Sequence, residues 1–185
     1  HPGMTLLDGE AIKALIVEVA AELEDEAERT IIVVGGSLLA WHGLRDATED
    51  VDSIRRLDDA LRQAVKTVAA RHGLAANWLN DHAAPWAPAT LDVDACEVLL
   101  ERGRLRVLGL PLRDIFLMKL NRGDPPDLVD MRSVWPLVRD EFASSAEVMA
   151  AYYAAFPNED PADDPHLGDF VVTELAKGGF ELPLK

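Results

Sequence analysis

Two aspartates separated by one residue, Asp50 and Asp52, are the side chains of this sequence best suited to chemistry. On a β-strand successive side chains point to opposite faces, so both carboxylates would share one face and Val51 would lie on the other. Two such acids repel each other unless a cation lies between them. Mg²⁺ usually binds one or two carboxylates, while phosphates and water complete its coordination. The pair therefore predicts a site for Mg²⁺ or Mn²⁺; the alternative is an ordinary solvated strand edge.

A glycine-containing turn precedes this pair. Residues 31–34 are β-branched and predict a buried strand. Gly35 and Gly36 interrupt it, and Ser37 is expected to cap a short helix over residues 38–42. Backbone N–H groups at such a helix start attract phosphate. A phosphate-binding turn followed by paired carboxylates is the arrangement that metal-dependent phosphoryl or nucleotidyl transfer requires; the alternative is an ordinary turn.

A lysine in apolar surroundings lies in the second half of the chain. Pro111 is predicted to open a helix that runs through Asn121 and contains Lys119. The Lys119 side chain could extend along the apolar surface to reach water. It could instead point into a cleft and hold a nucleotide triphosphate, for which a compact ammonium is suited. Arg122, three positions later, would lie on the same side of the helix.

The next predicted helix begins with acids. Asp124 is expected to cap it, with Pro125 and Pro126 in the first turn. Asp127 and Asp130 lie one turn apart beside its apolar stripe. Acids in a first turn can act only by favouring the helix dipole.

Three segments carry a resemblance to a known family. GGSLLAWHGLR followed by ATEDVD resembles the first motif of minimal nucleotidyltransferases of the polymerase-β superfamily. More narrowly, it resembles the AbiEii-like and MenT-like toxins of bacterial toxin–antitoxin systems. WLND at residues 78–81 and LMKLNRGDPPDLVDM at residues 117–131 are similar to segments of the same group. The resemblance covers roughly residues 30–135, and its specificity lies in the order of the three motifs.

The resemblance implies an α/β (α+β) fold of the polymerase-β nucleotidyltransferase type, in which helices cover a small mixed sheet and a helical portion follows. It implies metal binding by Asp50 and Asp52 and binding of the nucleotide phosphates by Lys119, these three being the catalytic residues. The residues implied in nucleotide binding are Gly35, Gly36, Ser37, Lys119 and Arg122. Asp127 and Asp130 are second-tier candidates that would orient Lys119, Arg122 or a metal-bound water. Asp92, Asp94 and Glu97 are available as the third carboxylate that such enzymes generally place on a later strand.

We therefore expect a metal-dependent nucleotidyltransferase that moves a nucleoside monophosphate from a nucleoside triphosphate to an acceptor and releases pyrophosphate. By resemblance, the acceptor is the 3′ end of a tRNA, and the protein is a growth-inhibiting toxin neutralised by a cognate antitoxin protein. A second interpretation makes the acceptor a protein or a small molecule. A third, from a different class, is a non-catalytic binding module with the same fold.

The net charge of −15 runs against RNA binding, because an RNA-binding protein is expected to carry a basic surface. Ten acids, five in residues 22–28 and five in residues 159–169, lie in segments without Lys or Arg. Such segments are solvated surface or dock a basic partner. Arg102, Arg104 and Arg106, in a predicted hairpin of strands 96–100 and 105–108, would form a basic stripe on one face. That stripe is a solvated edge or a phosphate contact.

The length of 185 residues suits a single compact unit. We expect an expression remnant at residues 1–3, a nucleotidyltransferase core over 4–110 and a C-terminal helical portion over 111–185 packed on the core. Helices are predicted over residues 6–28, 58–71, 144–156 and 170–177, and a loop or short strands over 77–90. Apolar runs are shorter than the ~20 residues of a membrane span. The single Cys96 fits a reducing cytoplasm.

Overall fold

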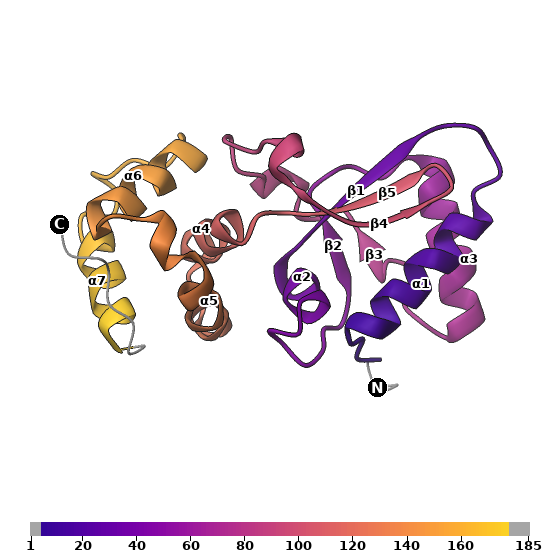
Figure 1. Ribbon diagram of the computed structural model, residues 1–185, viewed down its shortest axis with the longest axis horizontal. Coiled ribbons are helices and arrows are strands. Elements are labelled where there is room, and N and C mark those ends of the chain that lie inside the picture. The colour runs from indigo at the N-terminus through magenta and orange to yellow at the C-terminus, as the bar shows by residue number, and fades with distance from the viewer. Residues whose placement is uncertain (1–4, 178–185) are drawn as a thin grey trace. The chain divides into compact units, whose positions relative to one another are not determined.

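The computed structural model describes residues 5–177, so the predicted remnant at residues 1–3 lies outside the described residues. The chain divides into two compact units. Within the described residues, the first unit comprises 5–87 and 94–110, and the second comprises 88–93 and 111–177. Figure 1 labels the helices and strands of both units.

The first unit is built on a mixed sheet. Its strands are β1 (Arg29–Val34), β2 (Val51–Ser53), β3 (Leu79–Asn80), β4 (Glu97–Arg102) and β5 (Leu105–Gly109). In the described part of the chain these five strands follow the order β3-β2-β1-β5-β4. β1 is parallel to β5 and antiparallel to β2, β2 is parallel to β3, and β4 is antiparallel to β5. The central position of β1 explains why residues 31–34 are all buried and form an unbroken apolar run.

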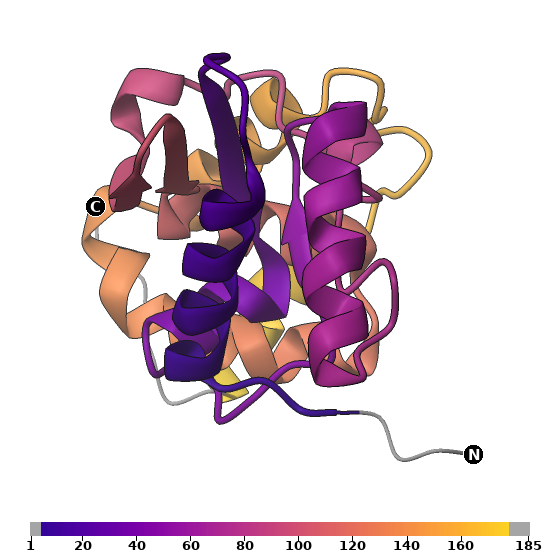
Figure 2. The same ribbon diagram turned by 90° about the vertical axis from the view of Figure 1, so that its right-hand side faces the viewer.

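Helices α1 (Gly9–Glu22) and α3 (Asp59–His72) lie side by side over one face of this sheet (Figure 2). Asp8 and Asp58 cap their first turns by accepting backbone N–H groups. Arg71 of α3 pairs with two glutamates of α1. The predicted helix over residues 58–71 is confirmed, but the opening helix ends at Glu22 rather than at residue 28. The acids beyond it form a loop in which Asp25 pairs with Arg29.

The β4–β5 hairpin is confirmed, but the predicted basic stripe on it is wrong. Arg102 pairs with Leu105 in the register and Arg106 pairs with Glu101, so Arg102 and Arg106 point to opposite faces. The reason is the two-residue turn at Gly103 and Arg104, across which strand alternation does not continue. Two of these arginines are also paired with acids: Arg104 with Glu26 and Glu28, and Arg106 with Glu101.

The second unit is helical. Its helices are α4 (Leu112–Arg122), α5 (Pro125–Val138), α6 (Ser145–Ala155) and α7 (Leu167–Lys177), with a 3₁₀ turn, η3 (Arg139–Glu141), after α5. Phe116, Trp135 and Phe142 form an aromatic cluster in its core, with ring centroids 5.2–6.5 Å apart. Such pairs add to the stabilisation that burial gives. The α/β class, the mixed sheet and the C-terminal helices predicted from the sequence are confirmed.

No helix within residues 5–177 combines the length and the apolar character needed to cross a membrane.

Candidate functional site

The two aspartates lie at the beginning of β2, next to the end of β1. The register pairs Asp52 with Val34, the last residue of β1, and Asp50 directly precedes β2. Val51 between them is fully buried, whereas both aspartates are partly exposed. The predicted alternation is therefore confirmed, with Val51 in the core and the acids on the accessible side.

The first glycine of the turn brings the Asp52 carboxylate against helix α2 (Gly35–Trp41). The φ of Gly35 is +64°, a left-handed conformation that side chains disfavour. A Cβ on Gly35 would lie 3.2 Å from Asp52 Oδ2. Gly35 is thus required both for the turn and for the close approach of this carboxylate. The helix also begins at Gly35, three residues earlier than predicted.

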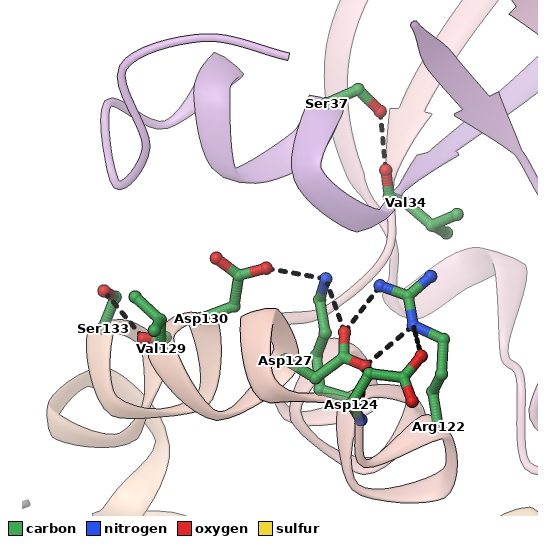
Figure 3. A network of polar contacts seen from close by, with 9 residues as sticks. Val34, Ser37, Arg122, Asp124, Asp127, Val129, Asp130 and Ser133 are labelled. Atoms are coloured by element: carbon green, nitrogen blue, oxygen red, sulfur yellow. Dashed lines mark hydrogen bonds and ion pairs between the residues drawn. The ribbon is translucent and has the colours of Figure 1, made fainter. Parts of the chain in front are cut away.

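Ser37 does not cap this helix, which corrects the prediction. It lies in the first turn, fully buried, and its Oγ donates a 2.6 Å hydrogen bond to the carbonyl of Val34 (Figure 3). The same Oγ accepts a 3.2 Å hydrogen bond from Asp52 N. The Ser37 hydroxyl therefore joins the turn to β2 and fixes the backbone of Asp52. Any contact between this turn and a phosphate would come from backbone N–H groups, which a helix start leaves available.

An arginine that the sequence analysis left without a role lies over the second glycine. A Cβ on Gly36 would lie 2.5 Å from Arg45 Nη1, so the guanidinium occupies the space that the missing side chain leaves. Thr48 fixes the loop that carries Arg45 through two backbone hydrogen bonds with Leu7, of 2.7 and 2.9 Å. The turn is thus flanked by a carboxylate at Gly35 and a guanidinium at Gly36. Arg45 is the last residue of the GGSLLAWHGLR motif, and this position in the motif was the one sequence signal that could have identified it as a candidate site residue.

The acids suggested as a third metal ligand do not join the pair in the first unit. Glu97 lies on β4, the far edge strand of the sheet, and faces His42 at 3.7 Å. Asp94 is exposed in the 3₁₀ turn η2 (Val93–Ala95), and Asp92 belongs to the second unit. Among the described residues, no group of three or more His, Cys, Asp or Glu side chains could hold a metal ion. Two carboxylates still fit Mg²⁺, whose remaining positions water and substrate phosphates commonly fill.

Lys119 lies in the second unit between α4 and α5. Its side chain is 6% exposed, which excludes the alternative that it extends to water. Its ammonium lies 2.8 Å from Asp130 Oδ2 and 3.3 Å from Asp127 Oδ1. Both acids project from α5 (Figure 3). The two second-tier acids therefore hold the lysine that the sequence placed beside them.

Asp127 also binds Arg122 through both carboxylate oxygens, at 2.6 and 2.8 Å (Figure 3). It completes a capping box with Asp124 at the start of α5. Burial alone would raise the pKa of Asp127, but hydrogen bonding from Arg122 and the charge of Lys119 hold this pKa below its usual range. The carboxylate is thus kept ionised inside a charge-balanced group.

Comparison with known proteins identifies the family. Residues 10–139 match the family described as nucleotidyltransferase of unknown function (DUF6036). Searches of curated proteins and of solved structures returned no match. The match includes the turn, the paired aspartates and the charged group of α4 and α5, and the mixed sheet with its helices is consistent with a nucleotidyltransferase-like fold. The chain therefore belongs to this nucleotidyltransferase family.

Proposed function

We propose that this protein is a metal-dependent enzyme that transfers a nucleoside monophosphate from a nucleoside triphosphate to a hydroxyl acceptor. The observation that carries the proposal is the close approach of the Asp52 carboxylate to Gly35, with Asp50 beside it. A carboxylate, the kind of ligand that Mg²⁺ prefers, thus lies at a turn whose backbone can approach a phosphate. Family membership supports the same reaction class.

In the proposed reaction, the acceptor oxygen attacks the α-phosphorus and the bond from that phosphorus to the bridging oxygen breaks. Pyrophosphate leaves, and the acceptor proton passes to solvent. Asp50 and Asp52 would hold Mg²⁺ or Mn²⁺, which when bound supplies neutralisation of phosphate charge. The backbone of Gly35, Gly36 and Ser37 would position the triphosphate. Catalysis of this kind depends mainly on positioning and electrostatic stabilisation.

Lys119 and Arg122 are proposed ligands of the nucleotide phosphates. Their present ion pairs with acids decide how a phosphate could reach them. The ammonium of Lys119 is buried between two carboxylates, so a phosphate would have to share it with Asp127 and Asp130. The side chain of Arg122 is 58% exposed and is the more accessible cation of the group. Asp127 would then act by orienting both cations.

The proposed acceptor is the 3′ end of a tRNA, which would make the protein a toxin neutralised by a cognate antitoxin. The order of the three motifs supports this finer assignment through their resemblance to toxin nucleotidyltransferases. The net charge of −15 favours a second candidate, in which the acceptor is a protein or small molecule.

Incubation with labelled nucleoside triphosphates, total tRNA and soluble cell extract separates the candidates. Label in RNA is the expected result. Label in protein or in a small molecule would support the second candidate, and absence of label under all conditions would leave a non-catalytic binding module. Expression of the chain with and without the product of the neighbouring gene tests the toxin assignment, because growth should stop only when the chain is expressed alone.

A further inference from the structure

Beside the β3 edge of the sheet, the first unit carries a second surface that contains exposed cations and an exposed tryptophan. We define the β3-edge surface by Arg56, Arg62, Lys66, His82 and Trp86, all exposed residues of the first unit. A cavity of about 130 Å³ lies within it. Leu57, Val65 and Leu79 give this cavity an apolar floor, and Arg62, Lys66 and His82 contribute to its polar lining.

One buried carboxylate organises the cations of this surface. Asp81 accepts hydrogen bonds from Leu57 N at 2.9 Å and from Arg62 Nη2 at 3.0 Å, and it faces Arg56 Nη1 at 3.7 Å. Arg62 also faces the fully exposed Asp59 at 3.7 Å, a pairing of little energetic value. The side chains of Arg56 and Arg62 remain 66% and 49% exposed. Asp81 therefore fixes the Arg62 guanidinium by a hydrogen bond and faces that of Arg56, while both guanidinium groups remain accessible.

Lys66 adds a cation without a partner among the described residues, and its side chain lines the cavity beside Arg62. Positive charge at this edge thus exceeds the negative charge that faces it. At the opposite edge of the sheet, acids pair with Arg104 and Arg106. A local excess of cations is the electrostatic feature that recognises a phosphate backbone, even on a protein that is acidic as a whole.

An exposed aromatic ring follows Asp81 by five residues along the chain. Trp86 is 61% exposed and ends the 3₁₀ turn η1 (Ala84–Trp86). That turn begins three residues after Asp81, and a 3.0 Å hydrogen bond from Ala84 N to the Asp81 carbonyl fixes it. The same buried residue therefore contacts the Arg62 guanidinium through its carboxylate and the loop that carries Trp86 through its carbonyl. Cations beside an exposed ring are the combination that binds single-stranded nucleic acid, since bases stack on the ring and phosphates meet the cations.

The cavity of the β3-edge surface borders β3, the strand next to β2. Asn80, which lines the cavity, pairs in register with Asp52 of β2. Neighbouring strands lie about 4.8 Å apart, so the strand at this edge lies directly beside the strand that carries Asp52. The cavity volume is below the roughly 300–1,000 Å³ of pockets that enclose a whole small molecule. It suits one base or one phosphate group of a longer chain better than a complete nucleoside triphosphate.

We infer that the β3-edge surface binds single-stranded RNA, with a base stacked on Trp86 and phosphates at Arg56, Arg62 and Lys66, and so leads the acceptor strand to the carboxylate pair. This inference rests on the proposed function, because it names the surface on which the proposed RNA acceptor binds. It also reconciles RNA binding with the acidic composition, because the cations are concentrated where the acceptor passes.

The test measures binding of a fluorescent single-stranded oligoribonucleotide of about a dozen nucleotides, within the roughly 4–16 nucleotides that known folds cover. Anisotropy titrations without nucleotide compare the full chain with Trp86→Ala, Trp86→Phe and Lys66→Ala. Matched controls are Val98→Ala and Arg102→Ala on β4, both exposed and at the opposite edge of the sheet. All five substitutions replace exposed side chains, and circular dichroism checks that each variant keeps its fold.

Trp86→Ala should weaken binding roughly 5- to 150-fold, the range given by loss of one base stack, and Trp86→Phe should restore most of it. Lys66→Ala should weaken binding and reduce the salt dependence of log K by about 0.7. The two β4 variants should bind like the unaltered protein. Equal binding by all variants, or failure of the unaltered protein to bind the oligonucleotide, would overturn the inference.

Transfer assays on the same variants distinguish failure of this inference from failure of the proposed function. If the protein labels RNA and the Trp86 and Lys66 variants do so with unchanged KM, the nucleotidyl transfer stands and the docking surface is wrong. If the protein binds the oligonucleotide but labels no RNA, the surface stands and the proposed RNA acceptor is wrong. Label in protein, with no RNA binding, would reject both the RNA surface and the RNA acceptor.

Discussion

The charged residues of the two units are arranged in opposite ways. In the first unit, Asp50 and Asp52 are like charges, partly exposed at the start of a strand. In the second, Lys119 and Arg122 are balanced by acids, and Lys119 and Asp127 are almost entirely buried. Two carboxylates on one accessible face are suited to share a metal ion, whereas the buried group of the second unit pairs opposite charges with each other.

The difference indicates how stability and activity are divided between the two regions. A partly exposed acid pair contributes little to folding and is accessible from solvent. A buried ion pair need not stabilise a fold relative to apolar residues, but removal of one partner leaves an uncompensated charge and is strongly destabilising. Substitutions at the acid pair should therefore alter chemistry, and substitutions in the buried group should alter stability.

The largest effect is expected from Asp50→Asn and Asp52→Asn. An amide is a poor substitute for a charged Mg²⁺ ligand, so each variant should lose nucleotidyl transfer by a factor on the order of 10³. The melting temperature should hardly change. Glu97→Gln, an exposed acid of the same unit, is the matched control and should keep full activity. Transfer at the unaltered rate by either aspartate variant would remove the metal site.

Metal removal tests the same pair without substitution. Excess chelator should abolish transfer, and added Mg²⁺ or Mn²⁺ should restore it, because two carboxylates cannot neutralise a triphosphate by themselves. The melting temperature measured with and without chelator should agree closely in the absence of nucleotide. Transfer that persists in chelator would exclude the proposed role of both aspartates.

Lys119→Ala should be the most destabilising single change in the second unit. It leaves Asp127 and Asp130 buried without their shared ammonium, at a cost of about 3–5 kcal/mol in the free energy of unfolding. Arg132→Ala, an exposed residue on the same helix as these acids, should cost far less. Chemical denaturation measures both.

Kinetics of Lys119→Arg separate the structural role of this residue from the proposed binding role. Arg keeps the charge but replaces a compact ammonium by a planar fork. If Lys119 binds the triphosphate, the variant should stay folded and recover only part of the rate. Full activity in a folded Lys119→Arg or Lys119→Ala variant would remove Lys119 from the site.

The sequence predicted the local order of elements better than the partners of charged side chains. The strand, turn and paired aspartates follow from β-branching, glycine and alternation, all of which act over a few residues. The burial of Lys119 could not be predicted, because it depends on how α5 packs against α4. The face of Arg102 was predicted wrongly, since a two-residue turn reverses the alternation between strands. Arg45 was missed because its proximity to Gly36 depends on the path of a loop.

The buried acid of the second unit should also make stability depend on pH. The pKa of Asp127 is lowered in the folded protein, so its contribution is fully present above the usual Asp pKa of about 4. It is lost as the pH falls through the lowered value. Asp127→Asn should therefore be less stable than the unaltered protein at pH 7, and the difference should shrink below about pH 4. Asp140→Asn, at an exposed position, is the control and should hardly change the melting temperature at pH 7. A stability difference for Asp127→Asn that is the same at pH 7 and at pH 3 would contradict the assignment.

The smallest effect is expected from Ser37→Ala, which tests how the first unit holds its acid pair. The Ser37 hydroxyl is fully buried and bridges Val34 O and Asp52 N, so its loss leaves two backbone groups with one partner fewer. The expected cost is about 1–3 kcal/mol in the free energy of unfolding. Ser133→Ala removes a comparable hydroxyl bond to a backbone carbonyl at an exposed position of α5 and should be nearly neutral.

Because the bridge fixes the backbone of Asp52, Ser37→Ala should also raise the metal concentration needed for half-maximal transfer, while Ser133→Ala should not. A Ser37→Ala variant that loses stability but keeps its metal dependence would show that the hydroxyl supports the fold alone. Loss of transfer at every metal concentration, with the fold retained, would instead show that the hydroxyl itself contacts the substrate.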